Sequence, residues 1–217
     1  MLKISRNMTK FQMHACMLAL AALLCASVSA QTLRSAALPD KLSDQLEALS
    51  KKAVEGDTNA QLRMGLAFEF GQGVDKNLEE AMRWYRKAAD HGDPLAQTNL
   101  AYLYESGGTG AANPEEAAKW YLRAAVSGLA RAQFNLGTLY LRGAGVERSD
   151  EDAAHWISEA AHAGCPSAVT ALGYLYANGI GVPRDDQKAR ELIQKAAKKK
   201  ILGYARVLAV RLSDQRC

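Results

Sequence analysis

The sequence is poor in the residues that build β-sheets. Aromatic residues make up 7% of its 217 residues, and valine and isoleucine are sparse, although β-strands are enriched in both kinds of residue. Alanine, the best helix former, supplies 39 of the residues that make the chain 48% hydrophobic. The shortage of sheet-forming residues excludes an all-β protein, and the excess of alanine predicts an all-α protein.

The chain also lacks a large excess of one charge sign, and it has few prolines. It carries 27 basic and 23 acidic residues, for a formal net charge of +4, and this balance is too even for a typical nucleic-acid-binding protein. Five prolines and 17 glycines are too few for a disordered or collagen-like chain. We therefore expect an ordered helical protein without a nucleic-acid partner.

The first thirty residues have the features of a secretory signal peptide. Residues 1–14 contain basic residues and no acidic residue, and an apolar run follows over residues 15–26. This run is too short to span a bilayer comfortably, and it leads to Val28-Ser29-Ala30, where small residues occupy the positions that signal peptidase reads. We predict cleavage between Ala30 and Gln31 and a periplasmic or secreted protein without a membrane span. An uncleaved membrane anchor is the alternative.

A period of 36 residues runs through the rest of the chain. Glycines, tryptophans and four columns of alanines recur at this spacing without insertion or deletion. The glycines are Gly56, Gly92, Gly128 and Gly164, and the tryptophans are Trp84, Trp120 and Trp156. A fixed period of this length indicates a repeat protein in which each unit packs on the next.

Each unit contains the signals of two helices joined by a turn. In the first unit, Ala60, Met64 and Phe68 share one helical face, and the helix is expected to end at Gly71 of a Gly-x-Gly-Val turn. The second helix is expected to begin after an N-capping residue, and the four candidates are Asn77, Asn113, Ser149 and Asp185.

Glycine also recurs inside the first helices, and one turn departs from the pattern. Gly65, Gly137 and Gly173 keep one face of the helix thin, which predicts close packing of the partner helix. The second unit has no glycine at position 109, so we expect a locally different loop there and an intact repeat.

These features together resemble the Sel1-like repeat, a relative of the tetratricopeptide repeat. The motif Ala-x3-Leu-Gly-x2-Tyr-x2-Gly-x-Gly-Val, followed by Ala-x2-Trp-Tyr-x2-Ala-Ala-x2-Gly, carries the resemblance over about residues 53–200. It implies an all-α, right-handed α-solenoid of four repeats (57–92, 93–128, 129–164 and 165–200). Half-repeat capping helices are expected within residues 31–56 and 201–217.

The repeat leaves some positions of the first helices free. Positions 59, 62, 66 and 69 and their equivalents vary while their neighbours are fixed. In tetratricopeptide-like solenoids this inner wall binds extended peptides or partner loops. By this resemblance the asparagines would bind the peptide backbone, the aromatic residues would be anchors and the arginines would meet carboxylates. The predicted groove residues are Asn99, Tyr102, Arg131, Phe134, Asn135, Thr138, Arg142, Thr170 and Tyr174. The alternative for Phe134 is burial between the repeats.

Removal of the leader leaves two of the four cysteines, Cys165 and Cys217. Cysteines of an exported protein can pair. Cys165 is expected at the start of the last first helix and Cys217 is the final residue, so an internal bridge would be strained. An internal bridge and an intermolecular bridge through Cys217, which would give a disulfide-linked dimer, both stay open.

The sequence contains no recognisable catalytic, cofactor-binding or metal-binding motif. The histidines are not part of a recognisable metal-ligand motif, and no phosphate-binding loop or nucleophile elbow occurs. We therefore expect an exported scaffold or adaptor, not an enzyme, that binds a protein or peptide during envelope complex assembly or signalling. The alternative is a secreted protein that hydrolyses or binds cell-wall material or β-lactam-like compounds, as implied by cysteine-rich members of the family.

Overall fold

The computed structural model describes the backbone of residues 40–207 and the side chains of residues 44–197. The chain divides into two compact units, residues 1–47 and residues 48–217. Helix α2 (Asp40–Val54) begins in the first unit and ends in the second. The predicted signal peptide and its cleavage site lie outside the described residues.

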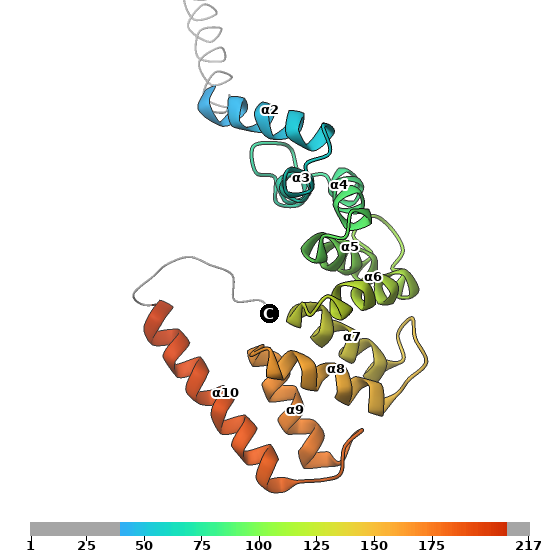
Figure 1. Cartoon of the computed structure of the whole chain (residues 1–217), viewed down its shortest axis with the longest axis vertical. Coiled ribbons are helices and arrows are strands. Elements are labelled where there is room, and N and C mark those ends of the chain that lie inside the picture. The colour runs from blue at the N-terminus through green and yellow to red at the C-terminus, as the bar shows by residue number, and fades with distance from the viewer. Residues whose placement is uncertain (1–39, 208–217) are drawn as a thin grey trace, which may run out of the picture. The chain divides into compact units, whose positions relative to one another are not determined.

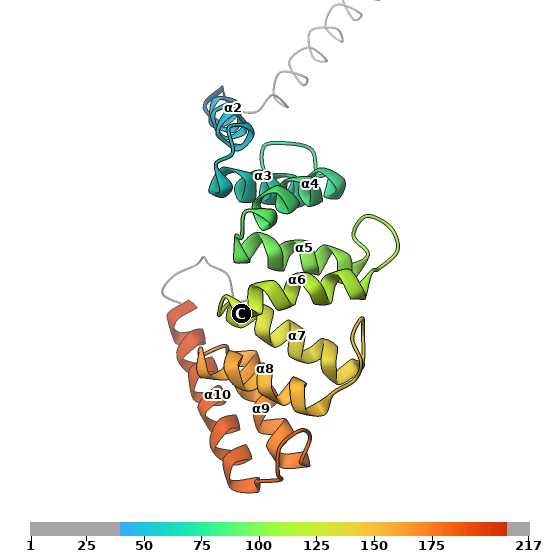
Figure 2. The ribbon, with the colours of Figure 1, turned by 45° about the vertical axis from the view of Figure 1, so that its right-hand side comes forward.

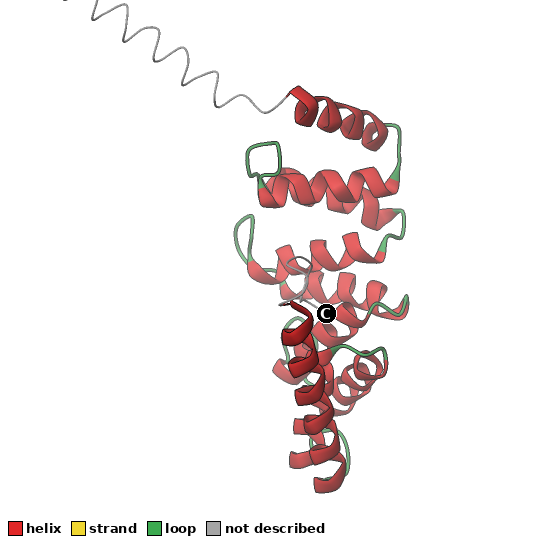
Figure 3. Ribbon diagram, turned by 90° about the vertical axis from the view of Figure 1, so that its left-hand side faces the viewer, coloured by secondary structure: helices red, strands yellow, loops and turns green. Residues whose placement is uncertain are grey.

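The second unit is built from consecutive helix pairs (Figures 1 and 2). The helices are α3 (Thr58–Phe70), α4 (Leu78–Asp90), α5 (Pro94–Ser106), α6 (Pro114–Val126), α7 (Ala130–Arg142), α8 (Asp150–His162), α9 (Pro166–Asn178) and α10 (Asp186–Val207). Each odd-numbered helix packs against the next helix in the chain, and each pair packs against the following pair. Between residues 40 and 207 the structure contains helices and loops but no strand (Figure 3). The predicted all-α solenoid is therefore confirmed.

The predicted helix boundaries follow from caps and left-handed glycines. Asn77 accepts a hydrogen bond from the backbone N–H of Glu80 at 3.0 Å, and Asn113 and Ser149 cap α6 and α8 in the same way. Helix α3 ends at Gly71, which has a φ of 68°. A β-carbon is unfavourable at this φ, so the turn requires glycine.

The glycines inside the first helices allow the close packing predicted from the sequence. A β-carbon on Gly65 would lie 2.4 Å from the ring of Tyr85, and one on Gly137 would lie 2.6 Å from Cγ1 of Ile157. Both Tyr85 and Ile157 are completely buried. The ring and the branched side chain therefore occupy the space that a β-carbon would fill.

The second glycine of the turn makes a contact that the sequence analysis missed. A β-carbon on Gly145 would lie 2.1 Å from the carbonyl carbon and oxygen of Pro114, and one on Gly181 would lie 1.8 Å from the carbonyl oxygen of Asp150. Pro114 and Asp150 begin the second helices of the preceding repeats. Each of these turns thus packs backbone against backbone on the repeat before it.

A glutamine side chain also links successive repeats. The Nε2 atom of Gln97 donates to the carbonyl of Ala89 at 3.1 Å, and Gln61 and Gln133 make the equivalent bonds at 3.1 and 3.2 Å. All three glutamines are buried. Each one therefore satisfies a carbonyl near the end of the second helix that precedes it.

The turn of the second repeat differs locally, as expected. Gly107 keeps the left-handed φ of 68°, but the hydroxyl of Thr109 lies 3.1 Å from the sulfur of Met82. Gly110 adopts a φ of 146°. The flanking helices α5 and α6 have the same length as those of the neighbouring repeats, so the repeat is intact.

The prediction of a separate C-terminal helix beginning at residue 201 is wrong. Helix α10 continues through residues 200 and 201 to Val207. The other second helices of the repeats stop just before Gly92, Gly128 and Gly164, whereas Lys200 occupies this position in the fourth repeat. The helix continues because the left-handed glycine that would end it is absent.

Cys165 lies at the N-cap of α9, where it is buried, and it is disulfide-bonded. Cys217 lies outside the described residues, so a disulfide-linked dimer remains a prediction. Within residues 40–207, no helix combines the length and the apolar character needed to cross a bilayer.

Candidate functional site

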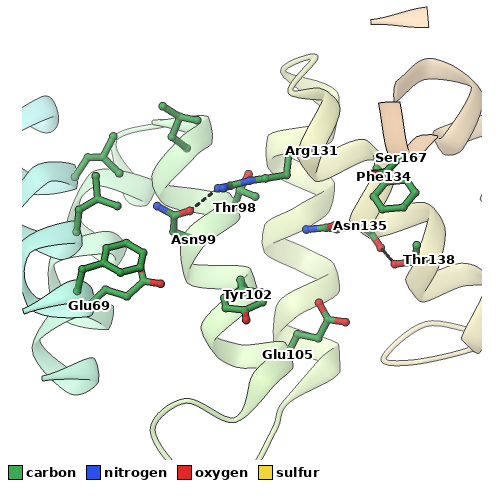
Figure 4. Close-up of a pocket in the computed structure, with 14 residues that line it drawn as sticks. Glu69, Thr98, Asn99, Tyr102, Glu105, Arg131, Phe134, Asn135, Thr138 and Ser167 are labelled. Carbon is green, nitrogen blue, oxygen red and sulfur yellow. Dashed lines mark hydrogen bonds between the residues drawn. The ribbon is translucent and has the colours of Figure 1, made fainter. Parts of the chain in front are cut away.

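A groove of about 470 Å³ lies along the first helices of three successive repeats, α3, α5 and α7, and reaches the start of α9 (Figure 4). This volume is in the range of ligand-binding sites. Six of the nine predicted groove residues line it: Asn99, Tyr102, Arg131, Phe134, Asn135 and Thr138. The variable positions of the first helices therefore form a common surface.

The other three predicted residues do not line this groove. Arg142 instead forms an ion pair with Glu105. The hydroxyl of Thr170 donates to the carbonyl of Pro166 at 3.1 Å, and Tyr174 is 60% exposed on α9. The groove is formed by the first three repeats and by Ser167 at the start of α9. Thr170 and Tyr174, which lie further along α9, are therefore beyond it.

Apolar side chains form both the floor and the rim of the groove. Leu62 and Thr98 are buried beneath it, whereas Phe70, Leu95 and Tyr102 are 51%, 46% and 48% exposed. Exposed aromatic and aliphatic side chains around a hollow are typical of binding surfaces. The hydroxyl of Thr98 is satisfied by the carbonyl of Pro94 at 2.7 Å, so the floor presents mainly apolar atoms.

A polar network behind the groove connects consecutive repeats. The hydroxyl of Tyr85 on α4 donates to the carboxylate of Glu69 on α3, and it lies beside the side chain of Asn99 on α5. In the next repeat, Tyr121 donates to Glu105 at 3.0 Å. Its hydroxyl likewise lies beside Asn135 on α7. The asparagines predicted to bind a peptide backbone thus also neighbour buried tyrosines.

The environment of the two tyrosines favours their protonated form. Burial is the main cause that raises the pKa of Tyr85, and the neighbouring carboxylate of Glu69 raises it further. Burial and Glu105 have the same effect on the pKa of Tyr121. Both hydroxyls therefore remain donors, and each fixes the orientation of a glutamate at the groove.

The network ends after the second repeat. The positions equivalent to Glu105, Tyr121 and Asn135 in the next repeat are Leu141, Ile157 and Ala171. Ile157 is fully buried like the tyrosines, so the packing position is kept while all three polar groups disappear together. This set of polar groups therefore lies between α3 and α7, and apolar side chains replace it between α7 and α9.

Three groove residues were not predicted from the sequence. Glu69 and Glu105 occupy variable inner-wall positions, and the tyrosines sixteen residues later in the first two repeats are the signal of a polar contact that could have identified them. Phe70 was missed because it lies outside the spacing of the variable positions. These three side chains add two negative charges and an aromatic ring to the groove.

The two threonine hydroxyls that line the groove are bonded to backbone carbonyls. The hydroxyl of Thr138 donates to the backbone carbonyl of Asn135 at 2.7 Å, and the hydroxyl of Thr98 is bonded to a carbonyl in the same way, so neither is paired with a base. Among the side chains of residues 44–197, no group of three or more histidine, cysteine, aspartate or glutamate residues is placed to hold a metal ion.

Fold and groove together define an α-solenoid of tetratricopeptide-like helix pairs. Four consecutive segments, residues 58–93, 94–128, 130–165 and 166–200, match the Sel1 repeat. The chain belongs to the Sel1 repeat family. The matched segments and the four predicted repeats differ by at most one residue at each end.

Two solved structures illustrate the likeness. A Sel1 repeat protein from Oxalobacter formigenes is 36% identical, with 67% of this chain and 60% of that chain covered and a TM-score of 0.63. A protective antigen of uropathogenic Escherichia coli that displays an SLR fold is also 36% identical, with 76% and 37% covered and a TM-score of 0.69. The chain thus spans less than two thirds of the length of either relative. No curated protein matches it.

Proposed function

We propose that this protein is an exported scaffold that binds a peptide segment of a partner protein in the groove along α3, α5 and α7. The single observation that carries the proposal is that variable residues of three successive repeats line one groove while the scaffold residues are fixed. Sel1-repeat solenoids are commonly protein-interaction scaffolds, and the identity of the partner is not encoded in the repeat columns.

Export is supported by the basic and apolar composition of residues 1–30 and by the disulfide-bonded state of Cys165. Disulfides persist in oxidising compartments such as the periplasm. A protein in this compartment would meet partners in the bacterial envelope. We therefore infer a role in envelope complex assembly or in signalling across it.

The experiment that tests the proposal is site-specific photo-crosslinking in cells. A photo-reactive amino acid replaces Tyr102, which lines the groove, or Tyr174, which occupies the equivalent position two repeats later and lies outside it. Both tyrosines are exposed to a similar degree, so they form a matched pair. We expect a discrete crosslinked partner from position 102 and none from position 174.

The alanine variants of the same two residues provide the second half of the test. Tyr102→Ala should reduce recovery of the partner that is crosslinked from a third groove position, Phe134, whereas Tyr174→Ala should not. Circular dichroism confirms that both variants keep their helices. Equal crosslinking from positions 102 and 174, or unchanged recovery with Tyr102→Ala, would exclude the groove as the binding site.

A further inference from the structure

The groove contains a basic side chain that no carboxylate neutralises. Arg131 on α7 is half-buried and lines the groove. Among the side chains of residues 44–197, it has no acidic group within ion-pair distance. Its guanidinium instead donates to the amide oxygen of Asn99 (Figure 4). Arg142, by contrast, is neutralised by Glu105.

A carboxylate in the same groove has no basic partner. Glu69 on α3 is half-buried, and it accepts a hydrogen bond from the hydroxyl of Tyr85. In the part of the chain whose side chains are described, no lysine, arginine or histidine lies within ion-pair distance of it. Phe70 and Tyr102, both partly exposed, line the groove together with Glu69. Aromatic rings beside a carboxylate favour a bound cation.

The two unpaired charges are joined by a chain of hydrogen bonds and side-chain contacts. Arg131 donates to Asn99, the side chain of Asn99 lies beside the hydroxyl of Tyr85, and Tyr85 donates to Glu69. Two hydrogen bonds, one amide group and one close contact span roughly 10 Å. The charges are therefore close enough for neighbouring side chains of one ligand, yet they do not neutralise each other directly.

We propose that the groove selects an extended peptide segment with an acidic and a basic residue two positions apart, the acidic one bound to Arg131 and the basic one to Glu69. The inference rests on the proposed peptide-binding function and specifies its ligand. In an extended chain, side chains two positions apart point to the same side and lie about 7 Å apart. This spacing fits the limit set by the hydrogen-bond chain.

The rest of the groove suits the residues around this charged pair. Leu66, Leu95 and Phe134 line the groove as well, so apolar side chains of the peptide would contact them. A charge pair held in a half-buried site is stronger than the same pair in water. The charged pair therefore determines which peptides bind, and the apolar surface adds affinity that depends less on sequence.

The inference is tested by selection of random dodecapeptides, displayed on phage, against the purified full-length protein. We expect enriched sequences to carry an acidic and a basic residue two positions apart. Synthetic peptides of the enriched sequences are then titrated by fluorescence anisotropy against the wild type, Arg131→Gln, Glu69→Gln and Arg63→Gln. Glutamine at position 69 keeps an acceptor for Tyr85, and glutamine at position 131 keeps a donor for Asn99.

Arg131→Gln and Glu69→Gln should each weaken binding about tenfold. Arg63→Gln should change binding less than about twofold, because Arg63 is an exposed residue of α3 that does not line the groove. Replacing the acidic residue of the peptide should not further reduce its affinity for the Arg131→Gln variant. Peptides that require Tyr102 but lack the charged pair, or that bind both variants normally, would overturn this inference and leave groove binding standing. Peptides insensitive to Tyr102→Ala, or no enrichment, would overturn groove binding too.

Discussion

The contact between Gly181 and the preceding repeat yields a sharp stability prediction. Gly179 and Gly181 belong to the same turn and have φ values of 66° and 62°. Alanine at either position therefore has the same backbone strain, about 1–2 kcal/mol. What differs is the space around them. A β-carbon on Gly179 would lie 3.4 Å from Cβ of Arg184, which is an ordinary contact.

A β-carbon on Gly181 would lie 1.8 Å from the carbonyl oxygen of Asp150 and 2.9 Å from Cβ of Ala154. Because the closest obstacle is backbone, no change of rotamer relieves it, and the turn must move by more than 1 Å away from α8. Such overpacking costs about 1–3 kcal/mol. We expect Gly181→Ala to lower the free energy of unfolding by about 2–5 kcal/mol in total and Gly179→Ala by about 1–2 kcal/mol.

The measurement is urea denaturation followed by circular dichroism, with amide hydrogen exchange to locate the change. Since each repeat contacts only its neighbours, the loss of protection in Gly181→Ala should concentrate in α8, α9 and α10. In Gly179→Ala it should be smaller and confined to the end of α9. Equal destabilisation by the two substitutions would refute the conclusion that backbone contact between repeats limits position 181.

Three further predictions concern the buried tyrosines and the leader. Tyr121→Phe removes the hydroxyl that donates to Glu105, and it should lower the free energy of unfolding by about 1–2 kcal/mol in urea denaturation. Folding raises the pKa of Tyr85 and Tyr121. The free energy of unfolding should therefore be constant below the pKa of tyrosine in the unfolded chain, about 10, and should decrease as the pH rises above it. Urea denaturation at a series of pH values should show a smaller decrease in a variant with both tyrosines changed to phenylalanine. Mass spectrometry of the exported protein should find Gln31 at its N-terminus, and retention of the leader would contradict the predicted cleavage.

The helix pairs were predictable because their signals are local and recur in every repeat. Asn77 caps a helix through the N–H three residues later, and Gly71 ends one through its own left-handed backbone. Neither depends on distant residues, and four copies in register make the pattern unambiguous. The continuous α10 was predicted wrongly, although the sequence carries a local signal for it, because Lys200 replaces the glycine that ends the other second helices.

The contacts between repeats were less predictable because the residues involved are distant in sequence. The Gly-x-Gly-Val motif that contains Gly145 indicates a turn. No neighbouring residue in the sequence shows that this turn packs against Pro114 of the preceding repeat. The groove was predicted through its variable positions, yet its extent depends on where the solenoid wall is hollow. That depends on side-chain volumes from several helices, so Tyr174 was expected at the site and Phe70 was not.

Three positions that differ together between repeats show how the inner wall can change its polarity while its packing is kept. Tyr121 and Ile157 are equivalent residues, both fully buried against the first helix of their own repeat. Isoleucine at this position preserves the packing but lacks the tyrosine hydroxyl. The glutamate and asparagine that neighbour this hydroxyl in the second repeat are replaced by Leu141 and Ala171 in the next. A partial change would leave a buried polar group unsatisfied, at a cost of about 1–3 kcal/mol. The polarity of the inner wall therefore differs between repeats by a whole set of residues, and the charged side chains that line the groove all come from the first three repeats.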